Sequence, residues 1–133
     1  MPTFQLDILT PAKKAYSGRV QSLQAPGSEG SFGVLPGHAP MLGALGIGRI
    51  RFVEVNGASW EAATSGGFAE VQRDRVILLV ETEEMGTEID VARARAARDR
   101  ALERLAQQQN IDRARAQAAL ARALNRLRVA HAG

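Results

Sequence analysis

The sequence contains no cysteine and few aromatic residues. Its 133 residues include no Cys, and aromatic side chains make up 5% of them. Without thiols the chain forms neither disulfide bridges nor thiolate metal sites, which suits a reducing cytoplasm. No apolar run approaches the ~20 residues of a membrane span, and the first residues lack the basic-then-apolar run of a signal peptide. We therefore expect a protein that meets a membrane only indirectly, as a peripheral part.

The last third of the chain lacks a different set of residues. After Thr87 there is no Pro, no aromatic residue and no Gly before Gly133, whereas Ala and Arg are abundant. Residues 1–87 carry 7 basic and 9 acidic side chains (net −2), and residues 88–133 carry 10 and 5 (net +5). An anionic partner is therefore expected to meet the C-terminal stretch.

Short segments with strand-like patterns recur every 8–12 residues before Thr87. Residues 27–40, with four Gly and two Pro, predict a shaped loop, and Asn56-Gly57 predicts a two-residue hairpin turn. This spacing predicts an antiparallel β-sandwich or barrel. The predicted strands are Phe4–Leu9, Val20–Ala25, Ile50–Val55, Ser59–Thr64, Phe68–Val71 and the apolar Arg75–Glu81, which we place centrally in a sheet.

Two helices are predicted after the sandwich. Thr87-Glu88-Ile89-Asp90 resembles a capping box, so the first helix runs from about Ile89 to Ala106. The polar stretch Gln107–Asn110 breaks it, and Asp112 or Asn110 caps a second helix that continues to about Ala130. Such a short break predicts an antiparallel hairpin, so we divide the chain into a domain at 1–86 and a hairpin at 87–133.

The predicted seam between the helices is rich in alanine. Its stripes are Ala94, Ala97, Ala101 and Leu105 on the first helix and Ala116, Leu120, Leu124 and Leu127 on the second. Alanine removes little apolar area from water, at ~25 cal/mol per Å². We therefore expect a hairpin of marginal stability that could leave the sandwich.

One face of each helix concentrates arginine. These faces hold Asp90, Arg93, Ala97, Arg100 and Arg104 on the first helix and Arg115, Ala119, Arg122, Arg126 and Val129 on the second. Several guanidinium groups beside Asp90 would make a phosphate cradle. The alternative is a solvated basic face with Asp90 as a helix cap. Nucleic-acid binding is disfavoured because the tail lacks aromatics and three acidic residues interrupt its basic face.

The sequence shows no constellation typical of catalysis. His38 is a lone loop histidine, no serine sits in a nucleophile motif, and there is no P-loop, metal triad or carboxylate pair. Trp60 and Phe68 fit core or interface anchors better than ligand stackers. We expect neither a catalytic site nor a metal site.

Four separated motifs resemble one family. GSEGSFGVLPGHAP (27–40), SGGFAEVQ (65–72), IDVARA (89–94) and ALNRLRVA (123–130) are similar to the epsilon subunit of bacterial F-type ATP synthases. The resemblance implies a ten-stranded β-sandwich followed by a two-helix hairpin. It also implies a rotor subunit on the cytoplasmic face of the cell membrane that contacts the gamma subunit and the c-subunit ring. The hairpin would inhibit ATP hydrolysis by reaching the alpha and beta subunits of the catalytic head.

The resemblance further implies specific contacts. Some bacterial members bind ATP as a regulatory ligand in the folded hairpin, and no cofactor is required. The residues that match this site are Glu84, Ile89, Asp90, Arg93, Ala94, Arg100, Arg122 and Arg126. Glu29, Ser31 and His38 would lie near gamma and the c ring. The alternative from another class is a free-standing nucleotide sensor or a basic nucleic-acid-binding adaptor.

Overall fold

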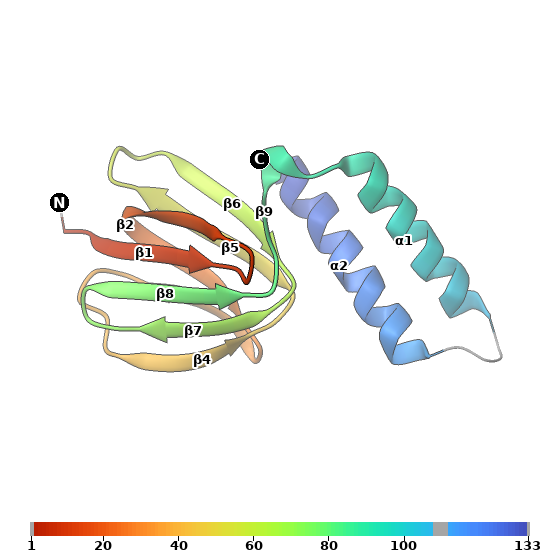
Figure 1. Ribbon diagram of the computed structural model, residues 1–133, viewed down its shortest axis with the longest axis horizontal. Coiled ribbons are helices and arrows are strands. Elements are labelled where there is room, and N and C mark those ends of the chain that lie inside the picture. Colours follow the sequence, from red (N-terminus) through yellow and green to blue (C-terminus); the bar gives the residue numbers. More distant parts are fainter. Residues whose placement is uncertain (1, 108–111, 133) are drawn as a thin grey trace.

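Nine strands and a helical hairpin form the part of the chain that the structure describes. The structure is a computed structural model that describes residues 2–107 and 112–132 (Figure 1). The strands are β1 (Phe4–Leu9), β2 (Lys14–Gly27), β3 (Gly30–Val34), β4 (Met41–Leu45), β5 (Gly48–Glu54), β6 (Ser59–Thr64), β7 (Gly67–Val71), β8 (Arg75–Val80) and β9 (Glu83–Met85). A short 3-10 helix, η1 (Gly86–Glu88), leads to α1 (Val91–Ala106) and α2 (Arg113–Ala132). The predicted fold is confirmed, with nine strands where the sequence predicts about ten.

The strands fold into two layers that share the long strand β2. Its first half pairs with β1, and its second half pairs with β3 and β5. One layer continues through β1, β8, β7 and β4, and the other through β5, β6 and β9 (Figure 1). Among the described strand pairs, β1 and β8 alone run parallel. β8 lies between β1 and β7, the central position that its apolar sequence predicts.

The glycine-rich segment 27–40 is not one continuous loop, and this prediction is wrong. Part of it forms β3, which runs antiparallel to β2. Gly30, with φ at +140°, allows the chain to reverse between the two strands. Phe32 packs against the core and Val34 is buried in it. Intervening glycines and a serine hide this alternation in the sequence.

Inward-facing side chains of eight strands form a single core between the layers. Its largest fully buried members lie on β1, β2, β3, β5, β7 and β8, and every buried residue of this cluster belongs to a strand. The cluster is Phe4, Leu6, Ile8, Val20, Leu23, Ala25, Val34, Leu45, Ile50, Phe52, Ala62, Ala69, Val71, Val76, Leu78 and Val80. The sandwich therefore has an apolar core that does not depend on the helices.

An aspartate caps α1, which begins two residues later than predicted. The carboxylate of Asp90 accepts a hydrogen bond from the backbone N–H of Arg93 at 3.0 Å. The helix therefore begins at Val91 rather than Ile89, and Thr87 lies in η1. A carboxylate at this position also interacts favourably with the positive end of the helix dipole.

A second aspartate caps α2. Asp112 accepts a hydrogen bond from the backbone N–H of Arg115 at 3.0 Å, as one of the two predicted alternatives requires. The other, Asn110, lies outside the described residues, as does most of the predicted break. Gln107 follows the end of α1.

Small side chains form the helix–helix seam, with one difference from the predicted stripe. Ala94 and Ala101 of α1 are buried. On α2, Leu124 is 44% exposed, whereas its neighbour Ala123 is 1% exposed. Successive residues are turned by about 100° around a helix axis, so Ala123 faces the seam and Leu124 faces away. The seam is thus even poorer in large apolar side chains than predicted.

The hairpin stands at one end of the sandwich and touches it through few residues (Figure 1). Val129 of α2 is fully buried and forms a small apolar cluster with Ala63 of β6 and Ile89. Asn125 is 5% exposed, and its Nδ2 donates to the carbonyl oxygen of Gly48 at 2.7 Å. Such a small contact area contributes little stability, which fits helices that can separate from the sandwich.

Candidate functional site

A cavity of about 400 Å³ opens where the hairpin meets β9. Its walls come from β9, η1, the first turns of α1 and the C-terminal half of α2. The lining residues are Glu84, Glu88, Ile89, Asp90, Arg93, Ala94, Ala97, Arg100 and Arg126. Every residue predicted to contact a nucleotide is among them except Arg122.

Helix α1 presents two cationic side chains to this cavity. Arg93 and Arg100 are seven residues apart, so they lie on one face, two turns apart. Among the described residues neither forms an ion pair. Guanidinium groups bind phosphate oxygens in a bidentate manner. The Asp90 carboxylate, held by its capping bond to the backbone of Arg93, lines the same cavity, which thus offers both donors for an anion and an acceptor.

An ion pair across the cavity connects the hairpin to the sandwich. The Nε of Arg126 on α2 lies 2.5 Å from Oε1 of Glu84 on β9, and the two side chains are 35% and 34% exposed. These two predicted nucleotide contacts therefore bind each other. A phosphate that binds Arg126 would have to share this guanidinium with Glu84.

Arg122 does not line this cavity of about 400 Å³. It is one helical turn before Arg126 and lines a smaller cavity with Asn125 and Thr64. The two cavities share Glu84 and Arg126 as lining residues. The position of Arg122 depends on how α2 docks against β6, and the spacing of residues within a single helix does not reveal this docking.

Glu83, which sequence analysis does not single out, has the most unusual carboxyl group near the cavity. Burial raises the pKa of Glu83 to about 7; Glu88 adds to the rise, Lys13 opposes it and Glu84 adds further. Its Oε1 is buried and has no hydrogen-bond partner among the described residues. In the sequence Glu83 and Glu84 look equivalent, and only the pairing of β9 with β6 distinguishes them.

The three predicted subunit contacts do not form one cluster. Glu29 lies in the turn between β2 and β3, and Ser31 near the start of β3. His38 lies in the loop after β3, where its Nδ1 is 2.7 Å from the carbonyl oxygen of Ala39. Because β3 spans about 13 Å, its ends present these residues at separate places.

The outer face of the β4–β7–β8 layer carries a row of exposed apolar side chains. Phe68 of β7 lies opposite Leu79 of β8 and Ala44 of β4, and Leu79 lies opposite Leu9 of β1. Phe68 and Leu79 are 46% and 50% exposed, and Leu42 on the same layer is 69% exposed. Phe68 is therefore not a core residue. A row of exposed apolar side chains across neighbouring strands is typical of a protein-binding surface.

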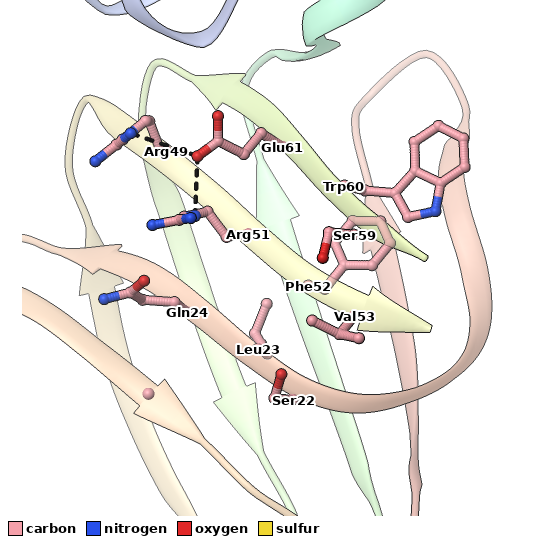
Figure 2. A pocket seen from close by; sticks show the side chains of 11 residues that line it. Ser22, Leu23, Gln24, Arg49, Arg51, Phe52, Val53, Ser59, Trp60 and Glu61 are labelled. Atoms are coloured by element: carbon pink, nitrogen blue, oxygen red, sulfur yellow. Dashed lines mark hydrogen bonds and ion pairs between the residues drawn. The ribbon is translucent and has the colours of Figure 1, made fainter. Parts of the chain in front are cut away.

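The outer face of the other layer holds an open groove of about 590 Å³ between β2, β5 and β6. Figure 2 shows Arg49 and Arg51 reaching the same oxygen of Glu61, at 3.4 and 2.9 Å. Trp60 is 40% exposed at the groove, where its Nε1 donates to Glu54. The remaining lining residues are Ser22, Leu23, Gln24, Gly33, Phe52, Val53 and Ser59.

The described part of the chain contains no group of three or more His, Cys, Asp or Glu side chains arranged to hold a metal ion. Among the same residues, no helix combines the length and the apolar character needed to cross a membrane.

Fold and cavity together define a class: a β-sandwich that carries a two-helix hairpin at one end, with a charged cavity where they meet. Two family models match this chain in the same order. The ATP synthase, Delta/Epsilon chain, beta-sandwich domain matches residues 3–86, and the long alpha-helix domain of that chain matches residues 87–131.

Similar proteins carry the same family name. The ATP synthase epsilon chain of Pelotomaculum thermopropionicum is 48% identical over 80% of this chain and 78% of the relative. That of Nitratidesulfovibrio vulgaris strain DP4 is 50% identical over 79% and 78%. The chain belongs to the ATP synthase epsilon chain family.

Two solved structures share the fold. A chain of the Euglena gracilis mitochondrial ATP synthase superposes with a TM-score of 0.82 at 22% identity, covering 91% of this chain and 77% of that one. A chain of the Tetrahymena thermophila mitochondrial ATP synthase central stalk and c-ring gives 0.58 at 18% identity, covering 97% and 94%. At these identities the likeness concerns the fold.

Proposed function

We propose that this chain works in the rotor, the central stalk, of an F-type proton-translocating ATP synthase. There it helps couple proton flow to ATP synthesis as a non-catalytic subunit, and its hairpin restrains ATP hydrolysis. Membership in the epsilon chain family supports this role. The structural neighbours, which belong to ATP synthase complexes, are consistent with it.

The sandwich is proposed to bind the gamma subunit and to lie on the c ring. The exposed apolar row that includes Phe68 and Leu79 supports a permanent protein partner, because large apolar side chains at the surface are costly unless covered. Glu29, Ser31 and His38 are proposed to contact gamma and the c ring. Through these partners the chain would lie at the cytoplasmic face of the cell membrane without entering it.

The hairpin is proposed to exist in two arrangements. Folded, it packs on the sandwich as in Figure 1; released, it reaches the alpha and beta subunits of the catalytic head. The small docking contact through Val129 and Asn125 supports release. The net charge of +5 on residues 88–133 suits contact with acidic segments.

ATP is proposed to stabilise the folded arrangement by binding the cavity at the hairpin root. The observation that carries this proposal is the convergence of Arg93, Arg100 and Arg126, from both helices, on one cavity beside Asp90. A ligand that contacts both helices and β9 binds the folded arrangement alone. At 100 times its Kd such a ligand stabilises that arrangement by ~2.7 kcal/mol.

Thermal unfolding of the isolated protein tests ATP binding. ATP should raise the melting temperature of the wild type, and Arg93→Ala should abolish the rise because it removes a phosphate ligand. Arg95→Ala is the matched control, since Arg95 is an exposed arginine of α1 that does not line the cavity. No rise in the wild type at millimolar ATP would remove the ATP role and leave the rotor role.

A pull-down from solubilised membranes separates the rotor from the alternative of a free-standing sensor or nucleic-acid adaptor. Recovery of alpha, beta and gamma subunits supports the rotor. Recovery of RNA with a steep dependence on salt would support the adaptor instead.

A further inference from the structure

We infer that the groove on the outer face of β2, β5 and β6 is a docking site for an extended, acidic segment of another protein. The segment carries a carboxylate that binds the arginines of the groove and, two positions along, an apolar side chain. This goes beyond the proposed rotor function, because the groove and the apolar row proposed to bind gamma lie on the outer faces of different layers.

Strand residues that share one face form the floor of the groove. In the pairing of β5 with β6, Arg51 lies opposite Glu61 and Val53 lies opposite Ser59. The two pairs are two residues apart, so their side chains project from the same side of the layer. On the other side of Val53, β2 places Ser22 opposite it. The small side chains of Ser22 and Ser59 therefore flank Val53 and leave the surface hollow.

The groove has an excess positive charge around Glu61. Arg49 and Arg51 bind the same oxygen of this one carboxylate (Figure 2). Each of the other described ion pairs joins one arginine to one carboxylate. The lining residues thus carry two positive charges and one negative charge, although residues 1–87 as a whole sum to −2. An external anion is favoured at this place on the sandwich.

Arg51 keeps donors for such an anion. Its described ion pair uses Nε alone, and its side chain is 53% exposed. The two Nη groups have no hydrogen-bond partner among the described residues, and a guanidinium group binds a carboxylate in a bidentate manner. Because Glu61 already holds this guanidinium in place, binding costs less side-chain ordering.

The part of the groove away from Arg49 favours an apolar side chain. Val53 and Trp60 line it, and Figure 2 shows the indole ring on that side. The Nε1 of Trp60 donates to Glu54, whose other carboxylate oxygen accepts a hydrogen bond from Tyr16. Glu54 does not line the groove, but its negative charge disfavours a second carboxylate there. The indole ring offers apolar area to a side chain of the partner.

The spacing within the groove determines the pattern of the segment. Glu61 and Ser59 are two positions apart on β6, or about 7 Å along the strand. An extended peptide repeats its side chains on one side at the same spacing. An acidic residue and an apolar residue two positions apart therefore match the groove. One excess charge is too few for nucleic acid, whose affinity comes from several contacts with phosphates.

Fluorescence of the isolated full chain tests the inference. The chain contains one Trp, so its emission reports on the groove. The probe is a blocked pentapeptide of threonines with glutamate at its second position and leucine at its fourth. It should change the emission in a saturable manner, and more weakly at high salt. The same peptide with glutamine in place of glutamate should bind at least about tenfold more weakly, because it lacks the charge-assisted contact.

Two variants locate the binding site. Arg51→Gln should weaken binding of the glutamate peptide about tenfold. The matched control Arg73→Gln, at an exposed arginine in the turn between β7 and β8, should bind it as the wild type does. Ser59→Glu adds a negative charge to the groove and leaves the ion pairs of Glu61 in place. It should also weaken binding, which guards against a folding defect in Arg51→Gln.

Several results would overturn the inference. They are the absence of a saturable change, equal binding of the glutamine peptide, and wild-type binding by Arg51→Gln. An equal response to inorganic phosphate at the same concentration would show a general anion site instead. Tighter binding of a single-stranded oligonucleotide would show a nucleic-acid partner.

The outcome is independent of the rotor proposal. If the peptide binds but the pull-down recovers no ATP synthase subunits, the rotor proposal fails and this inference stands. If the subunits are recovered but the peptide does not bind, the reverse holds.

Discussion

At the start of β7, the backbone of Gly67 passes directly against β8. Its φ is +154°, and a Cβ added there would lie 2.0 Å from the carbonyl oxygen of Leu79. No small adjustment relieves a clash with paired backbone. Gly67→Ala should therefore lower the free energy of unfolding by at least about 2 kcal/mol, measured by urea denaturation. Gly33→Ala, where the nearest atom is 3.8 Å away, should be close to neutral; equal losses in both would contradict this account.

Asn125 connects α2 to the sandwich through a side-chain hydrogen bond. Its side chain is buried and donates to Gly48, so Asn125→Ala removes a hydrogen bond that connects the helix to β5. We expect docking to weaken by ~1 kcal/mol, seen as faster amide exchange in α2 and unchanged exchange in β1. Leu124→Ala, at an exposed neighbour, is the control. Equal effects of the two substitutions would show that helix stability, rather than docking, had been measured.

At the scale of elements, local signals predicted best. β6 has the predicted bounds, Ser59–Thr64, and the turn at Asn56-Gly57 forms, with Gly57 at φ +89°. The parallel pairing of β1 with β8 was missed because those strands are some 70 residues apart in sequence and no local pattern encodes their direction. β3 was missed because glycine conceals a strand pattern while still permitting pairing.

In the candidate site, too, local sequence patterns predicted some features and missed others. The shared face of Asp90, Arg93 and Arg100 follows from helical spacing, and the structure places all three at one cavity. The pairing of Arg126 with Glu84 depends on how α2 docks on β9, which the residues around either partner do not specify. The resemblance to the epsilon subunit family implies that both residues contact ATP, but it does not imply that they contact each other.

For the molecule as a whole, the two parts differ in how they are stabilised. The sandwich has its own core of strand residues, whereas the hairpin depends on an alanine seam and a small contact with β6. A chain that lacks residues 88–133 retains every buried member of the sandwich core. It should therefore remain folded with a cooperative thermal transition, which circular dichroism would show.

The most direct test of the inhibitory hairpin is the rate of ATP hydrolysis by the purified ATP synthase complex, compared between the full chain and the chain lacking residues 88–133. The control for assembly is that the full-length chain and the truncated chain are recovered in equal amounts with their complexes. If the released hairpin blocks the catalytic head, its removal should raise the rate of ATP hydrolysis. We expect a rise of about fivefold or more, because coupling between two sites of a protein typically changes an equilibrium by at least that factor. An unchanged rate with both subunits fully assembled would contradict the proposal that the hairpin restrains the enzyme.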